Sequence, residues 1–91
     1  MTNSRTIKYH NEFVTALDIN NYLSPFCFAS GDSEGKVVVW KLATGKSDAP
    51  IFVWENSSCI SKLAWSKNGL KLGITDVEGC INVISFPRSK L

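Results

Sequence analysis

The chain has 91 residues and a mass of 10.1 kDa, 44% of its residues are hydrophobic, and its mean hydropathy is close to zero. These values predict one small globular unit rather than a disordered or membrane-embedded chain. The longest apolar runs are only a few residues, against the roughly 20 needed to cross a bilayer, so we expect no membrane insertion. A formal charge of +2 and a pI of 8.5 give no case for a nucleic-acid partner, for which a domain pI above about 9 is typical. Residues 1–8 are polar and lack the apolar core of a secretory signal, which indicates an intracellular protein.

Short segments rich in β-branched and aromatic residues, bounded by glycine, proline and polar residues, predict an all-β fold. No segment has a strong helical period. In chain order, we expect strands at residues 6–9, 14–19, 26–30, 37–42, 51–54, 60–65, 71–75 and 81–86. Gly35, Gly69 and Gly79 each end a polar stretch, and they predict tight hairpin turns with positive φ.

The sequence contains an internal repeat. Residues 30–40 align with residues 74–84, with an aspartate, a glutamate and a glycine in register. Residues 14–19 match residues 60–65 after two extra residues in the loop at 20–25. A unit of about 40 to 45 residues written twice has the length of a four-stranded propeller blade.

The first copy resembles a WD repeat in its spacing of His10, the apolar residues of 14–19, the Ala-Ser-Gly of 29–31, the acidic turn with Gly35, and Trp40. In the WD-repeat family, a histidine, a serine or threonine, an aspartate and the tryptophan form a buried hydrogen-bond network. The resemblance assigns that network to His10, Ser30 and Trp40, with Glu34 replacing the aspartate. The second copy has Asn56 and Ile84 at the histidine and tryptophan positions, so we expect it to be held by packing alone.

A longer resemblance, along nearly the whole chain, is to the last two repeats of dynein intermediate chains. It is carried by residues 10–14, 24–29, 35–42, 48–50, 60–66 and 76–83, and its most specific part is the final repeat, with Trp65 ending the first strand and no tryptophan ending the last. In that family the propeller docks on the dynein heavy chain, which implies a protein partner and a cytoplasmic, cytoskeleton-associated location. The region with which the family binds light chains and dynactin has no counterpart in this sequence.

These resemblances imply two WD-type four-stranded antiparallel blades, a partial β-propeller that does not close a ring alone. We divide the chain into residues 1–9, containing a ring-closing strand; 10–47, the repeat with His and Trp; 48–86, a degenerate repeat that lacks its outermost strand; and 87–91, a tail. Because propellers have about 4 to 8 blades, we expect other blades from a longer chain or from self-association.

We expect no catalysis, cofactor or metal. Two acidic pairs, Asp32 with Glu34 and Asp76 with Glu78, lie in equivalent hairpin turns, where acidic residues are common. No glycine-rich loop is followed by the Lys-Ser or Lys-Thr of a phosphate site. Cys27, Cys59 and Cys80 lack metal-site or redox spacing and are interpreted as buried, reduced thiols.

The loops of a blade alternate between two ends, which separates the charges. One end collects Glu12, Asp32, Glu34, Glu55, Asp76 and Glu78, and the other collects Lys41, Lys46, Lys67, Lys71, Arg88 and Lys90. Two interpretations stay open: solvated strand ends, or an acidic face that binds a basic partner. Trp54 and Trp65 are likewise either core or interface residues, and Trp54, on an outermost strand, is the better interface candidate.

Residues 89–91 read Ser-Lys-Leu, a peroxisomal address, and Pro87 is expected to leave this tripeptide free. Three function classes therefore follow. The first is a non-catalytic protein–protein interaction scaffold similar to dynein intermediate chains, the second is a generic WD-repeat scaffold of another intracellular complex, and the third is a peroxisomal protein.

Overall fold

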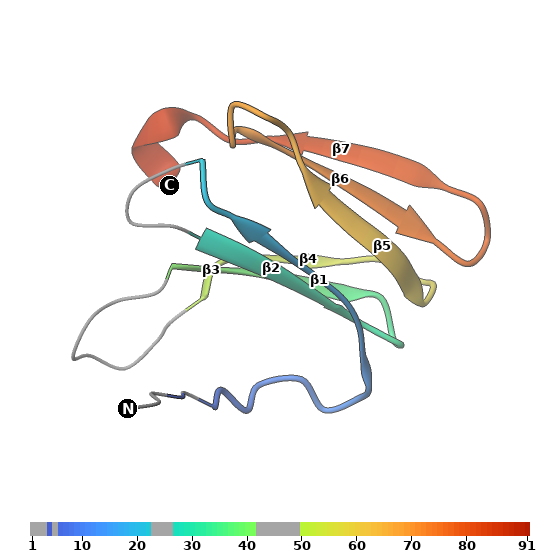
Figure 1. Cartoon of the computed structure of the whole chain (residues 1–91). Coiled ribbons are helices and arrows are strands. Elements are labelled where there is room, and N and C mark those ends of the chain that lie inside the picture. Colours follow the sequence, from blue (N-terminus) through green and yellow to red (C-terminus); the bar gives the residue numbers. More distant parts are fainter. Residues whose placement is uncertain (1–3, 5, 23–26, 42–49) are drawn as a thin grey trace.

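The computed structural model describes residue 4 and residues 6–22, 27–41 and 50–91. Its strands are β1 (Val14–Asn20), β2 (Cys27–Asp32), β3 (Lys36–Lys41), β4 (Pro50–Glu55), β5 (Ile60–Trp65), β6 (Lys71–Asp76) and β7 (Ile81–Ser85), followed by one turn of 3-10 helix, η1 (Arg88–Lys90). The strands form two antiparallel sheets in the orders β1-β2-β3-β4 and β5-β6-β7 (Figure 1). The prediction of an all-β chain is confirmed.

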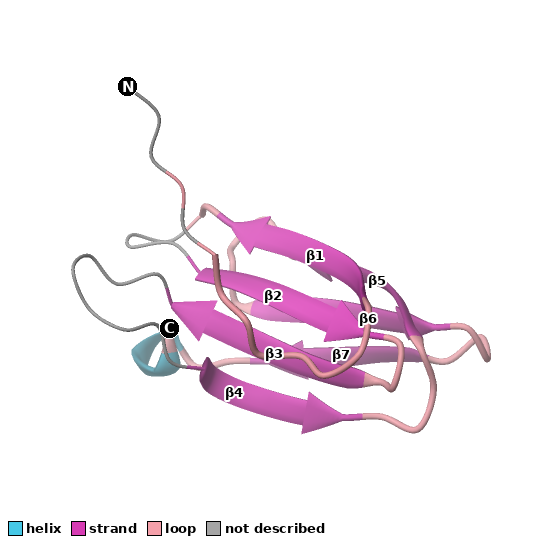
Figure 2. Cartoon of the chain, turned by 90° about the horizontal axis from the view of Figure 1, so that it is seen from below, coloured by secondary structure: helices cyan, strands magenta, loops and turns pink. Residues whose placement is uncertain are grey.

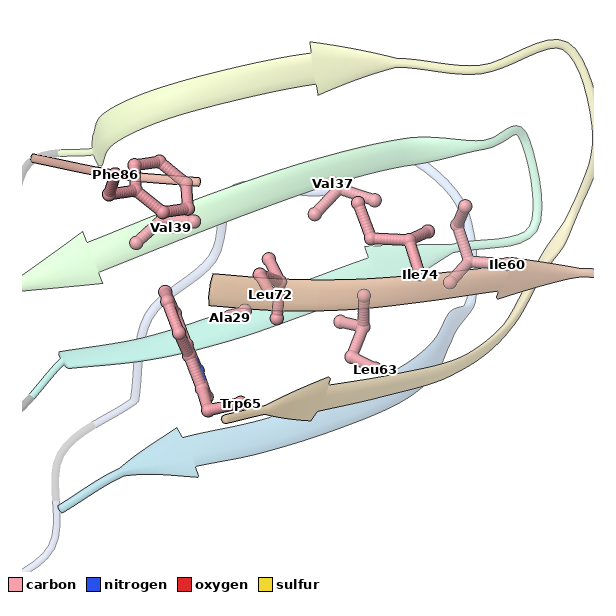
Figure 3. Close-up of a cluster of buried hydrophobic side chains, with 9 residues drawn as sticks. All are labelled: Ala29, Val37, Val39, Ile60, Leu63, Trp65, Leu72, Ile74 and Phe86. Atoms are coloured by element: carbon pink, nitrogen blue, oxygen red, sulfur yellow. The ribbon is translucent and has the colours of Figure 1, made fainter. Parts of the chain in front are cut away.

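The two sheets pack face to face, and the hydrophobic core lies between them (Figure 3). The core is built from alternate residues of the facing strands, because successive side chains of a strand point to opposite faces. Its buried members are Ala29, Val37, Val39, Ile60, Leu63, Trp65, Leu72, Ile74 and Phe86.

The two copies of the sequence repeat fold alike. The first strand of each sheet has a bulge at the same place, between Val14 and Ala16 in β1 and between Ile60 and Lys62 in β5. The turn glycines at equivalent positions have similar positive φ, 95° for Gly35 and 88° for Gly79, and Gly69 in the β5–β6 turn also has the predicted positive φ, at 73°. A repeat detected in the sequence is therefore a repeat of backbone geometry.

The sheet boundary does not coincide with the boundary of the sequence repeat. Strand β4, which begins the second copy in sequence, pairs with β3 and completes the first sheet. The second sheet has three strands, and within the described residues no strand pairs with the outer edge of β7. The prediction that the last sheet lacks its outermost strand is confirmed, so of the two predicted four-stranded units only the first has four strands within the described residues.

The predicted strand at residues 6–9 does not form in this chain. The segment crosses the outer face of the first sheet (Figure 2), where the ring of Tyr9 meets the ring of Trp40 edge to face at 5.1 Å. A strand needs a hydrogen-bonding neighbour, and at this place the segment meets side chains of a sheet face rather than a sheet edge. The ring-closing role of the segment stays a prediction.

Candidate functional site

A buried hydrogen-bond network ties the segment before β1 to the first sheet. His10 Nδ1 lies 2.7 Å from Asp32 Oδ2, His10 Nε2 lies 2.7 Å from Ser30 Oγ, and Trp40 donates its indole N–H to Ser30 Oγ at 3.1 Å. One consistent set of donors has Trp40 donating to Ser30, Ser30 to His10 and His10 to Asp32. The predicted association of His10, Ser30 and Trp40 is therefore present.

The acidic member of this network is Asp32, and its assignment to Glu34 was wrong. Asp32 is 3% exposed, whereas Glu34 is exposed and contributes only its backbone N–H, which donates to Asp32 Oδ1 at 3.0 Å. The period of two would have given the right residue: Ser30 and Asp32 are two apart on one strand, so their side chains share a face.

The second copy keeps half of this network, so the expectation that it is held by packing alone was also wrong. Asn56, at the position of His10, donates its amide to Asp76 Oδ2 at 2.7 Å. A hydrogen bond from the Ser58 hydroxyl to Glu78 adds a second link across the same loops. An amide supplies the N–H that the imidazole supplies in the first copy, and this equivalence was missed because the comparison looked only for a histidine.

Each aspartate also holds its own hairpin turn. Asp32 Oδ1 accepts the backbone N–H groups of Glu34 and Lys36 at 3.0 and 2.9 Å. In the second sheet, Asp76 Oδ1 accepts those of Glu78 and Cys80 at 2.9 and 3.0 Å. A carboxylate that accepts several N–H groups fixes the turn conformation, because each acceptor position satisfies a donor that the tight turn leaves unpaired.

The same bonds control the ionisation of both aspartates. Burial alone would raise the pKa of Asp32, but the hydrogen bonds from His10, Lys36 and Glu34 outweigh it and hold the pKa below its usual value. The pKa of Asp76 is lowered chiefly by the hydrogen bond from Asn56 and then by the N–H of Cys80, against a smaller effect of burial. Both groups therefore favour the carboxylate form in the folded chain.

The predicted acidic face is present in part. The loops that carry it all lie at one end of the two sheets, on the right in Figure 1. Asp32 and Asp76, at 3% and 7% exposed, are committed to the turns and are not available to a partner. The exposed carboxylates of this end, called here the acidic end, are those of Glu12, Glu34, Glu55 and Glu78.

The predicted basic residues lie at the opposite end. Lys67, Lys71, Arg88 and Lys90 are exposed there, and the half-buried Lys41 donates to the backbone carbonyl of Leu91 at 3.0 Å. Lys46 lies outside the described residues.

Two further predictions about single residues need correction. Trp54, the candidate interface aromatic, is half-buried and packs inward against the core, so it contributes to the packing of the sheets. Of the three cysteines, only Cys27 is buried as expected; Cys59 is half-buried and Cys80 is exposed. Burial raises the pKa of the Cys27 thiol, against a smaller opposite effect of Lys41.

The C-terminal Ser-Lys-Leu is not free, contrary to expectation. Residues 88–90 form η1, which folds the chain back, and Leu91 packs against the hydrophobic core. The Lys41 bond to the carbonyl of Leu91 adds a polar contact. Pro87 ends strand pairing as predicted, but the residues after it return to the sheets.

No protein-family model matches the chain, and no curated protein matches it. Across the described ranges there is no group of three or more His, Cys, Asp and Glu side chains arranged to hold a metal ion. A search of the same ranges finds no helix with the length and apolar character that a membrane span requires.

Proposed function

We propose that this chain is part of a WD-type β-propeller and acts as a non-catalytic protein–protein interaction scaffold similar to the C-terminal repeats of dynein intermediate chains. The observation that carries the proposal is the repeated unit of a bulged first strand, a buried aspartate and an acidic turn, present in both sheets. The aspartates make the turns rigid, and rigid turns can present side chains to a partner without a large loss of conformational entropy on binding.

The acidic end is the surface we assign to the partner. Three of the exposed glutamates lie in loops and the fourth, Glu55, ends β4, while the two buried aspartates stabilise the hairpin turns that carry Glu34 and Glu78. Such a surface attracts a basic partner, and the attraction weakens with salt because exposed charges are screened within about 10 Å at 0.1 M. The partner proposed is the dynein heavy chain.

The proposal is tested by measuring the affinity of this chain for a dynein heavy-chain tail at low and high salt. We expect the double variant Glu34→Lys/Glu55→Lys to bind roughly tenfold or more weakly at low salt, chiefly through slower association. Lys67→Glu, an exposed charge reversal at the opposite end, is the matched control and should leave binding unchanged. Absence of binding, or equal affinity of the double variant and the control, would refute the proposal.

The location proposed is cytoplasmic and cytoskeleton-associated. The contacts of Leu91 with the core and Lys41 oppose reading of the Ser-Lys-Leu as a peroxisomal address. Fluorescent fusions ending with and without Leu91 should therefore give the same distribution. Import that depends on Leu91 would favour the peroxisomal alternative, and binding of the acidic end to a basic protein other than dynein would favour a generic WD-repeat scaffold.

A further inference from the structure

The two sheets meet through faces that are not equivalent. The first sheet contributes Val37 and Val39 to the core. In the repeat, these residues correspond to Ile81 and Val83, which lie on the outer face of the second sheet and are 75% and 63% exposed. The second sheet therefore uses its opposite face to contact the first.

The converse holds for the first sheet. The second sheet contributes Leu63 and Trp65 to the core, and the corresponding residues of the first sheet are Leu17 and Ile19. Leu17 and Ile19 lie on the outer face of the first sheet and are 59% and 52% exposed. Each outer face is thus the repeat counterpart of a face that is covered inside the chain.

Each chain therefore has two exposed sheet faces that correspond, position by position, to the two faces already packed together between its own sheets. We propose that copies of this chain associate head to tail, with the outer face of the second sheet of one copy packed on the outer face of the first sheet of the next. The faces are assigned from the packing within the chain alone, and only the expected ring sizes rest on the proposed propeller. An interface between unlike faces repeats from copy to copy until a ring closes or an open array forms.

The outer edge of β7 supports this arrangement. Asp76 donates its N–H to the carbonyl of Cys80, and Phe86 donates its N–H to the carbonyl of Leu70, so the backbone N–H and C=O groups of the even-numbered residues of β7 point towards β6. Because pairing alternates along an antiparallel strand, the backbone groups of Ile81, Val83 and Ser85 point away from β6. The counterparts of Ile81 and Val83 in the first sheet are Val37 and Val39 of β3, which pair with Trp54 and Phe52 of β4.

This edge also lacks the features that protect the other sheet edges. Strands β1 and β5 each carry a bulge and a charged residue, Asp18 and Lys62, and β4 begins with Pro50 and ends with Glu55. Strand β7 has no charged residue, proline or register shift. An unprotected edge of β-branched residues is expected only where another strand covers it.

The segment before β1 is placed to be that strand. Its Tyr9 contacts Trp40 on the outer face of the first sheet. Phe52 of β4 makes a similar edge-to-face contact, also at 5.1 Å, with Phe86 of the second sheet. Each segment thus places an aromatic ring on a neighbouring sheet face, although the two contacts are not at equivalent positions of the repeat, because Tyr9 corresponds to Glu55 rather than to Phe52. In the head-to-tail pair, residues 6–9 of one copy run beside β7 of the preceding copy and complete its sheet.

The contact between copies is weaker than the one within the chain. Inside the chain, the Thr15 hydroxyl donates to the carbonyl of Ile60 at 2.5 Å, and the Asp18 carboxylate accepts the N–H of Trp65 at 2.7 Å. At the corresponding positions the second sheet has Ser61, which keeps the hydroxyl, and Ala64, which has no acceptor. The loss of a charge-assisted hydrogen bond means that association must be measured over a concentration series.

The test is sedimentation equilibrium of the full 91-residue chain from micromolar to millimolar concentration. Propellers of about 4 to 8 blades correspond to rings of two, three or four copies, so we expect a mass that rises to one of these multiples of 10.1 kDa or a ladder of open multiples. Val83→Lys on one face and Leu17→Lys on the other should each remain monomeric at all concentrations. Val77→Lys, at an exposed position in the β6–β7 turn, is the control and should associate as the natural chain does.

Mixing the two face variants decides the geometry. Val83→Lys keeps the outer face of the first sheet, and Leu17→Lys keeps that of the second, so an equimolar mixture should form a dimer that grows no further. Ile81→Lys and Ile19→Lys replace either variant whose circular dichroism differs from that of the natural chain. A natural chain that stays monomeric at millimolar concentration, a Leu17→Lys variant that dimerises alone, or a mixture that does not pair would overturn the inference.

Discussion

Both sheets hold an acidic hairpin turn with a buried aspartate, but the side chains that bind this aspartate differ between the two sheets. In the first, a buried aspartate binds His10, and the network continues through Ser30 to Trp40. In the second, a buried aspartate binds Asn56, but Ile74 and Ile84 stand at the positions of the serine and the tryptophan. The carboxylate at the turn is common to both, and the rest of the network is not.

The reason for the difference is which face is covered. Ser30 and Trp40 point to the outer face of the first sheet, where hydrogen bonds and the Tyr9 ring hold them. Ile74 and Ile84 point into the interface between the sheets, where apolar side chains are stabilised by burial without a polar partner. The turn aspartates lie at the ends of the strands, where they accept N–H groups of the turns whichever sheet face is covered, and both copies keep them.

The largest expected effect compares the two leucines that occupy the same repeat position. Leu63→Ala empties a core site that is 8% exposed and should lower the free energy of unfolding by about 2 to 5 kcal/mol. Leu17→Ala, on the outer face, should change it by less than about 0.5 kcal/mol in dilute solution. Urea unfolding of both variants gives the comparison, and equal losses would mean that the outer face is covered.

The next largest effect is expected from the two turn glycines at equivalent positions of the repeat, Gly35 and Gly79. An alanine at either position is strained by its positive φ, at a cost of about 1 to 2 kcal/mol. At Gly35 the added methyl group also collides with the backbone carbonyls of Asn56 and Ser58, whereas at Gly79 it meets nothing within 4 Å. Gly35→Ala should therefore lose roughly 1 to 3 kcal/mol more than Gly79→Ala in thermal unfolding. Similar losses of stability in the two variants would show that the loop after β4 moves to make room for the added methyl group.

The third comparison separates the buried aspartates from the exposed glutamate. Asp32→Ala and Asp76→Ala each leave two turn N–H groups and one side-chain donor without their acceptor, which should cost about 1 to 3 kcal/mol. Glu34→Ala, whose side chain is exposed, should cost less than about 0.5 kcal/mol. Chemical denaturation of the three variants is the measurement. A loss of stability in Glu34→Ala equal to that in Asp32→Ala would mean that the Glu34 side chain belongs to the hydrogen-bond network.

The smallest effect is the response to acid. Because the pKa values of Asp32 and Asp76 are lowered in the folded chain, the stabilisation from their ionisation is fully present above the unfolded value of about 3.9. It is lost as the pH falls through the lower folded values. Denaturant midpoints measured from pH 6 to pH 2 should fall below about pH 4, and the fall should be shallower in Asp32→Asn/Asp76→Asn. An unchanged slope in that double variant would assign acid sensitivity to other groups.

Strand positions were largely predictable, because they depend on local pattern. The segment at 60–65 was predicted without error, and the other six described strands shifted by no more than two residues at either end. The strand at residues 6–9 did not form because that segment lies on the face of the first sheet, with no sheet edge of the described residues beside it. The sequence pattern shows whether a segment tends to form a strand, but not whether another strand lies beside it for pairing.

The site was predictable in composition more than in detail. His10, Ser30 and Trp40 came together as the spacing indicated, but the resemblance placed the acid at Glu34 rather than Asp32. The inward packing of Trp54 and the return of Leu91 to the core could not be read from the sequence, because both depend on how the second sheet is placed over the first.

The position of β4 makes the two sheets depend on each other during unfolding. The strand belongs to the first sheet by hydrogen bonding but to the second copy by sequence, and its Phe52 and Trp54 pack against the core between the sheets. Neither copy of the repeat can therefore open alone without removing a strand or a covering layer from the other. Calorimetry should accordingly record one cooperative transition, with equal calorimetric and van't Hoff enthalpies, rather than the separate melting of two repeats.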